Sequence, residues 1–152
     1  LNNVERKKLI EKFYRPYHYR LEKEVQTCLD NFKSCIIIDC HSFPSQSLPF
    51  EDSTLKRPDI CIGTSEFHTP KNLKNKIIEL CKKNEWTIAE NEPFSGTYVP
   101  MEFYKKYKRV HSVMIEVNRK LYMDEKTGEK LERFTYVKEK LSQIIEDVAN
   151  QY

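Results

Sequence analysis

Apolar residues recur at helical spacing in three stretches of the chain. The first stretch predicts a helix over residues 17–32 that begins at Pro16. The second follows Thr69 and Pro70, a pair typical of an N-cap and a first helical position. Its buried face would hold Leu73, Ile77, Leu80 and Cys81. The third predicts a long C-terminal helix with the apolar face Leu131, Phe134, Val137, Leu141, Ile144, Ile145 and Val148.

Shorter apolar runs between these helices predict strands. Residues 35–38 are apolar without a break and end in 39–41, as in a buried strand of a largely parallel sheet. Residues 110–117 alternate apolar and polar side chains and predict a second strand. Two further short strands are expected at 60–62 and 86–89, and a short aromatic-rich helix at 100–107.

The alternation of helices and strands predicts the fold class. We expect a three-layer α/β/α sandwich with a mixed, mostly parallel sheet. Its 152 residues fall within the usual size of one domain, so residues 1–152 are predicted to form a single domain. Residues 42–69 and 91–98 are expected to be mostly loop, because they hold several prolines and few apolar runs.

Composition indicates in which compartment the protein is expected. No apolar run approaches the roughly 20 residues that a bilayer-spanning helix needs, and the first residues lack the apolar core of a secretory signal. The five cysteines are an odd number without a C-x-x-C pair, which favours reduced thiols. These features predict a soluble cytoplasmic protein with no membrane partner.

Charge and glycine content exclude two further classes. The net charge is only +3, from 26 basic and 23 acidic residues, and lysines alternate with glutamates along the predicted helices. A nucleic-acid partner is therefore not expected. With three glycines in the whole chain, a glycine-rich phosphate loop cannot be built, which disfavours nucleotide chemistry.

Two polar residues stand at positions suited to chemistry. His41 follows the first predicted strand beside Asp39 and could bind a metal, although a histidine satisfied by a loop hydrogen bond is the more ordinary interpretation of its position alone. Glu116 lies in an apolar strand, where burying a carboxylate costs free energy unless it is paired or acts as an acid or base. The alternative for Glu116 is a structural ion pair with Arg119 or Arg57.

Other chemistries are less well supported. His18 and Glu22 lie one helical turn apart and could form a metal-ligand pair, but a solvated helix face is more usual. Cys40 adjoins His41, yet neighbouring residues of a strand point to opposite faces and would not share a proton. The aromatic residues at 103–107 are expected in the core. Two further histidines are predicted to be surface or capping residues: His68 and His111.

Four segments taken together, in chain order, resemble the C-terminal motifs of N-formylglutamate amidohydrolases. They are Asp-Cys-His-Ser-Phe-Pro at 39–44, Arg-Pro-Asp-Ile at 57–60, Phe-Ser-Gly-Thr-Tyr at 94–98 and Ile-Glu-Val-Asn-Arg-Lys-Leu-Tyr-Met at 115–123. Residues 14–18 also look like the helical segment that precedes the first motif in that family. The resemblance covers nearly all of the chain, and four ordered motifs are far more specific than any single one.

The resemblance implies a mechanism. The family is similar in fold to zinc carboxypeptidases, in which two histidines and one glutamate hold a zinc ion that activates water for attack on an amide carbonyl. By this resemblance, His41 would be the zinc ligand that comes last in the sequence. Glu116 would be the general base that takes the water proton and delivers it to the departing amine.

The resemblance also implies a substrate class, an N-formyl or N-acyl derivative of an acidic amino acid. Ser95, Gly96 and Tyr98 match the loop that closes over substrate in the family. Arg57 and Arg119 are the candidates for holding a substrate carboxylate, because a planar guanidinium meets a carboxylate with two hydrogen bonds.

The chain departs from the family pattern in two ways. It has Ser95-Gly96-Thr97 where family members often carry paired glycines, and it has no counterpart of the first two zinc ligands. We therefore expect those two ligands, a histidine and a glutamate, to be encoded before Leu1. Two other classes of function compete with hydrolysis: a non-catalytic metal-binding or protein-binding remnant of the fold, and a basic interaction module whose binding weakens with salt.

Overall fold

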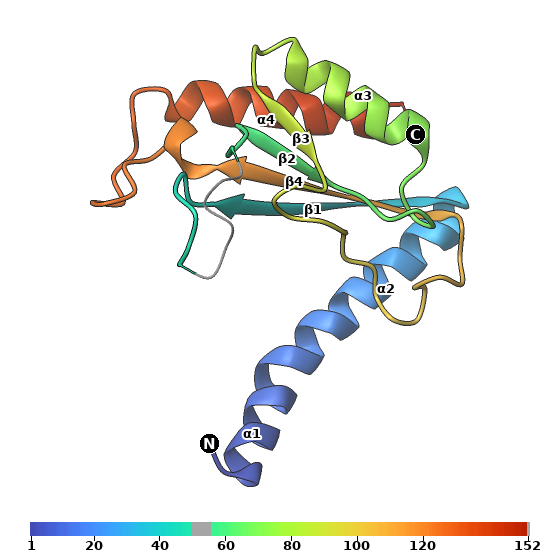
Figure 1. Ribbon diagram of the computed structural model, residues 1–152. Coiled ribbons are helices and arrows are strands. Elements are labelled where there is room, and N and C mark those ends of the chain that lie inside the picture. Colours follow the sequence, from blue (N-terminus) through green and yellow to red (C-terminus); the bar gives the residue numbers. More distant parts are fainter. Residues whose placement is uncertain (50–55, 152) are drawn as a thin grey trace.

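The computed structural model describes residues 1–49 and 56–151 (Figure 1). It begins with a helical arm of three consecutive pieces: α1 (Asn3–Leu9), the π-helical η1 (Ile10–Tyr14) and α2 (Arg15–Phe32). The predicted start at Pro16 lies one residue from the start of α2 at Arg15, but the helical chain extends further toward the N-terminus and starts at Asn3, where Asn2 caps it. Pro16 is tolerated because it sits in the first turn of α2, directly after a segment in which the regular α-helical bonding is already interrupted.

A four-stranded sheet forms the centre of the molecule. Its strands are β1 (Cys35–Phe43), β2 (Ile60–Gly63), β3 (Ile88–Glu90) and β4 (Val110–Asn118), in the spatial order β1-β4-β2-β3. The pairs β1–β4 and β2–β3 are parallel, and β2–β4 is antiparallel. The predicted mixed, mostly parallel sheet is thus confirmed. Among the described strands β1 lies at one edge and pairs along its whole length with β4.

Helices cover both faces of the sheet, as Figure 1 shows. The helices α3 (Lys71–Lys82) and α4 (Phe134–Ala149) lie on one face, and the end of α2 reaches the other. The larger core lies under α3 and α4; its fully or nearly fully buried members include Ile60, Ile62, Leu73, Ile77, Val113, Ile115, Val137, Ile144 and Val148. A smaller core under α2 contains Val25, Cys35, Val99, Phe103 and Val110. The three-layer arrangement follows from these two cores.

Further details of secondary structure differ from the sequence prediction. β1 continues through residues 39–43, so His41 lies within the strand and not past its end. β3 is shifted toward the C-terminus and begins at Ile88. Residues 101–106 form turns and no helix, because Lys105 has a positive φ of 54° that interrupts helical geometry.

Two polar residues also depart from their predicted roles. Thr69 does not cap α3; its hydroxyl donates a hydrogen bond to the Ser112 carbonyl instead, at 2.6 Å. His68 is not at the surface but fully buried. Its Nε2 accepts from the Lys105 amide at 2.8 Å, so its Nδ1 donates to the Val110 carbonyl at 2.7 Å, and both ring nitrogens are satisfied within the fold.

Two predictions made from composition concern membrane-spanning helices and the cysteines. None of the helices in residues 1–49 and 56–151 is both long enough and apolar enough to cross a membrane. All five cysteines are free thiols.

Candidate functional site

The strand pairing brings the predicted metal ligand and the predicted base together. In the parallel β1–β4 pair, His41 lies directly opposite Glu116. Side chains alternate along a strand, and Ile36 and Ile38 pack into the core under α3 and α4. His41 and its neighbour Asp39 therefore point to the other face, and Glu116 alternates with the core residue Ile115 to the same side.

Asp39 orients the imidazole of His41. The Nε2 atom of His41 lies 2.7 Å from Oδ1 of Asp39, and the His41 side chain is half exposed. This contact ties one ring nitrogen to a carboxylate and leaves Nδ1 as the nitrogen that can face a ligand. Histidines that bind metals are commonly held in this way through their other nitrogen. His41 lies within β1 and not in a loop, and its role as a metal ligand stays a prediction.

Glu116 is a buried carboxylate. The residue is 8% exposed, and its Oε2 atom has no hydrogen-bond partner among the described residues. Burial raises the pKa of the carboxyl group; the nearby Asp39 acts in the same direction, while His41 and Arg119 oppose it. The alternative of a structural ion pair with Arg57 or Arg119 is not found in the part of the chain that the structure describes.

Cys61 lies on the other side of Glu116. It is the residue of β2 that pairs with Glu116 in the sheet, and it is fully buried. Its thiol donates to the Phe94 carbonyl at 3.2 Å, and burial raises its pKa. Glu116 is therefore flanked by His41 on one strand and a neutral thiol on the other. The sequence carried no signal for Cys61, because the pairing of β2 with β4 is non-local.

The predicted substrate loop crosses the same face of the sheet. The amide of Tyr98 donates to Oδ2 of Asp39 at 3.0 Å, and the carbonyl of Tyr98 accepts from the Ser112 hydroxyl at 2.7 Å. Gly96 has a φ of 85° and approaches Gly63 of β2 closely. Ser95 is exposed. Of the three predicted loop residues, Tyr98 is thus the one with a direct contact to Asp39.

The two predicted carboxylate-binding arginines have different surroundings. The Arg57 guanidinium lies 5.5 Å from the ring centre of Phe43 and 5.4 Å from that of Phe94, so two aromatic rings hold it in place. Arg119 donates from Nε to the Ser42 hydroxyl and from Nη2 to the Ser42 carbonyl, both at 3.3 Å. Arg119 follows β4, which carries Glu116, and Arg57 precedes β2, the strand beside β4.

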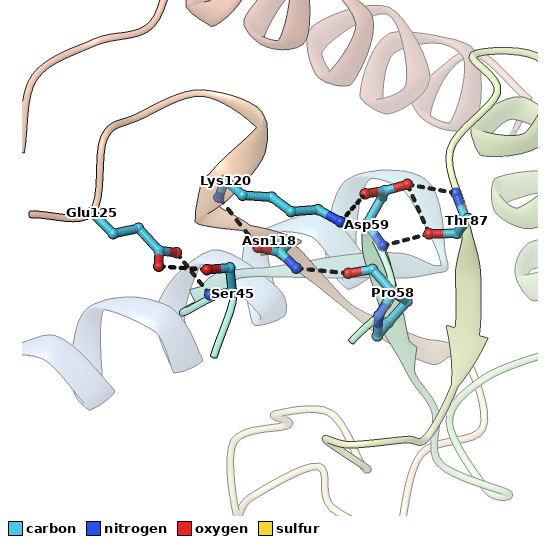
Figure 2. A network of polar contacts seen from close by, with 7 residues as sticks. All are labelled: Ser45, Pro58, Asp59, Thr87, Asn118, Lys120 and Glu125. Atoms are coloured by element: carbon cyan, nitrogen blue, oxygen red, sulfur yellow. Dashed lines mark hydrogen bonds and ion pairs between the residues drawn. The ribbon is translucent and has the colours of Figure 1, made fainter. Parts of the chain in front are cut away.

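A polar network fixes those two segments relative to each other (Figure 2). The buried Asn118 donates to the Pro58 carbonyl at 2.9 Å, and Lys120 forms a 2.9 Å ion pair with Asp59. Asp59 also accepts hydrogen bonds from Thr87. Burial alone would raise the pKa of Asp59, but the bonds from Thr87 and the charge of Lys120 lower it overall. The motifs at 57–60 and 115–123 therefore include residues that position the arginines.

His18 contacts the face of the sheet that carries His41 and Glu116, and the sequence analysis did not predict this contact. Its Nδ1 lies 2.6 Å from the Tyr98 hydroxyl, across 80 residues of sequence. With or without Glu22, it belongs to no group of three or more His, Cys, Asp or Glu that could hold a metal among the described residues. The resemblance of residues 14–18 to a family segment was the available signal.

Comparison with known proteins gives consistent similarities in sequence. A family model described as N-formylglutamate amidohydrolase matches residues 1–123. The chain is 28% identical over 149 residues to an N-formylglutamate deformylase of Pseudomonas putida, covering 97% of the chain and 53% of that relative. It is 25% identical over 123 residues to an N-formylglutamate deformylase of Pseudomonas aeruginosa, covering 80% of the chain and 46% of that relative. The chain thus spans about half the length of these relatives.

Solved structures show the same fold. The crystal structure of an N-formylglutamate amidohydrolase from Ralstonia eutropha JMP134 superimposes with a TM-score of 0.84 at 24% identity, covering 97% of this chain and 54% of that one. The gene product Atu2144 of Agrobacterium tumefaciens superimposes with a TM-score of 0.64 at 16% identity, covering 97% and 55%. The predicted fold class is confirmed by this likeness.

Proposed function

The chain belongs to the N-formylglutamate amidohydrolase family, and on this basis we propose that it supplies the general base and one metal ligand of a site that hydrolyses an N-formyl or N-acyl amino acid. The observation that carries the proposal is the placement of Glu116 directly opposite His41 on one face of the sheet. Because the chain spans about half the length of its relatives, the proposal concerns the whole protein that contains residues 1–152.

We propose zinc as the cofactor, and His41 fits one of its ligands. Asp39 occupies Nε2 of the imidazole, which leaves Nδ1 for a metal and makes it more basic. When bound, zinc would polarise the amide carbonyl and lower the pKa of a water molecule. The described residues hold no group of three possible ligands. From the family resemblance, we propose that the other two come from outside residues 1–152.

Glu116 is proposed to move the proton. Its carboxylate takes a proton from water as the water oxygen bonds to the amide carbon. It then gives that proton to the nitrogen as the carbon–nitrogen bond breaks, which releases a carboxylic acid and a free amine. A raised pKa suits both steps, because a base whose pKa lies closer to neutrality holds and returns a proton more readily.

An acidic N-acyl amino acid is the proposed substrate, N-formylglutamate being the example that the relatives' names give. Arg57 and Arg119 supply positive charge at the edge of the site, and a guanidinium can bind a carboxylate through two hydrogen bonds. Arg57 lies against the rings of Phe43 and Phe94, and these contacts limit the entropy lost when it binds. Tyr98, Ser95 and Gly96 are proposed to form the wall of the site above the sheet.

The test is hydrolysis by the whole protein, prepared with and without zinc. We expect release of formate from N-formylglutamate, with zinc bound in proportion to protein by elemental analysis. In the variant His41→Ala both the zinc content and the activity should fall while the protein stays folded. A folded, zinc-loaded protein that releases no acid from any N-acyl amino acid tested would favour a non-catalytic role.

A further inference from the structure

Through His18 the helical arm makes a polar contact with the face of the sheet that carries His41 and Glu116. The His18 imidazole and the Tyr98 hydroxyl are 2.6 Å apart, which is within hydrogen-bonding distance. Their ring centres lie 5.7 Å apart. Neighbouring rings of the arm pack on the imidazole: Tyr14 at 3.9 Å and Tyr17 at 5.1 Å between ring centres. The imidazole is thus held on the helix while its Nδ1 faces Tyr98.

Tyr98 is fixed at its backbone independently of this contact. Its amide is bonded to Asp39 of β1 and its carbonyl to Ser112 of β4, so the main chain bridges two strands. Neither bond sets the direction of the phenol. A tyrosine side chain retains rotational freedom about two torsions when its backbone is fixed, so a partner for the hydroxyl decides where the ring points.

The two contacts together link the arm to the candidate metal ligand. From α2, the connection runs through the His18 imidazole, the Tyr98 hydroxyl and the Tyr98 amide to Asp39, whose other oxygen holds His41. Burial raises the pKa of Tyr98, so the phenol stays neutral and can act as a hydrogen-bond donor at neutral pH.

We propose that His18 is a positioning residue: its hydrogen bond sets the direction of the Tyr98 phenol and so lets the helical arm shape the substrate side of the site. His18 touches no reacting atom in this account. The proposal rests on the proposed function for its kinetic consequence, but the contact itself can be tested without any turnover.

The structural part of the test uses the whole protein labelled with fluorotyrosine. The resonance that disappears in Tyr98→Phe identifies Tyr98 among the nine tyrosines of residues 1–152. In His18→Ala this resonance should shift or broaden, and His18→Asn, which keeps a polar atom near the position of Nδ1, should restore it partly. The control is Tyr19→Ala, an exposed neighbour on the same helix, which should leave the Tyr98 resonance unchanged. An unchanged Tyr98 resonance in His18→Ala would overturn the proposal, whether or not the protein is an enzyme.

The kinetic part of the test measures hydrolysis of N-formylglutamate by the same variants. Loss of one hydrogen bond predicts a fall in kcat/KM of about tenfold in His18→Ala and in Tyr98→Phe, and no further fall in the double variant. His18→Asn should recover part of the loss, and Tyr19→Ala should match the unmodified protein. Additive losses in the double variant would contradict a shared role. If the unmodified protein releases no formate, the proposed function fails, and the fluorine resonance alone decides the positioning role.

Discussion

Glu116 lies in an environment that is unfavourable for a charged carboxylate. A carboxylate in the interior normally finds a cation or several donors, and this one has an Oε2 atom without a hydrogen-bond partner among the described residues. Such an arrangement is expensive for a purely structural residue and common for one that exchanges protons. Its effect on stability therefore distinguishes the two roles.

We predict that Glu116→Gln changes the pH dependence of stability in the metal-free protein. Folding raises the pKa of this carboxyl group above its ordinary 4.5, so the folded state binds the proton more tightly than the unfolded state does. The stability that Glu116 contributes is present below pH 4.5 and is lost as the pH rises through the folded-state value. Glutamine does not titrate. The variant should therefore match the unmodified protein in acid and exceed its thermal midpoint at neutral pH. A variant that is less stable at neutral pH would indicate a structural ion pair.

Asp39 is predicted to control metal affinity through His41. In Asp39→Asn the side chain keeps its shape but cannot offer two anionic oxygens to His41 and Tyr98. We expect the zinc affinity of the whole protein to fall by roughly tenfold to a hundredfold, by analogy with other histidine ligands that lose a carboxylate partner. Competition with a chelator of known affinity measures this. The control Asp59→Asn removes a carboxylate that bonds Thr87 and Lys120 instead, and it should lower stability with unchanged zinc affinity.

At the scale of elements, the loop over the sheet depends on a close approach. A methyl group at position 63 would overlap the carbonyl oxygen of Gly96 and the side chain of Met114. Gly63→Ala should therefore push the loop away from β2, cost about 1–3 kcal/mol in the free energy of unfolding and raise KM. Gly128→Ala is the control, because its positive φ also strains alanine but nothing lies near the added methyl. It should lower the thermal midpoint without changing KM; an equal rise in KM for both variants would argue against a role for the loop.

The elements also show how far the sequence could be interpreted alone. The periodic apolar faces of α2, α3 and α4 and the alternation in β4 were sufficient to predict their positions to within a few residues. Residues 100–107 were predicted as a short helix rich in aromatic residues, but residues 101–106 form turns. Lys105, with its positive φ, and its bond to His68 determine the turn, and both are tertiary effects.

The candidate site was predictable only in part for the same reason. His41 was identified from its position after an apolar strand, Glu116 from its position in one, and both from the family motifs. Their juxtaposition requires the pairing of β1 with β4, which brings together residues 75 positions apart in the sequence. The partners that complete the face were not predicted: the contact of His18 with Tyr98, and the pairing of Cys61 with Glu116. Sequence periodicity reports which face a residue occupies and not which strand lies beside it.

At the scale of the whole molecule, a strand edge and several large apolar side chains lie exposed among the described residues. β1 has a partner strand on one side only among the described strands, and the apolar hollow beside it is lined by residues of β1 and α4. The helical arm projects from the body in Figure 1 and exposes large apolar side chains: Leu9, Phe13, Tyr14 and Tyr17. These features agree with the finding that the chain spans about half the length of its relatives.

We therefore predict that residues 1–152, prepared alone, bind zinc weakly. One histidine held by a carboxylate cannot replace the three protein ligands of a catalytic zinc site. Calorimetric titration should show affinity far below that of the whole protein, and His41→Ala should alter it little. Tight binding of one zinc ion per chain by residues 1–152 would show that the ligand set is misassigned.

The most direct test of the account is the turnover of Glu116→Gln in the whole zinc-loaded protein. Glutamine preserves the size and hydrogen-bonding reach of the side chain but cannot accept a proton from water. We predict that kcat for N-formylglutamate falls by roughly 10² to 10⁴ while the zinc content is retained and the thermal midpoint is not lowered. A variant with normal kcat per folded molecule and a lowered thermal midpoint would contradict the assignment of Glu116 as the general base.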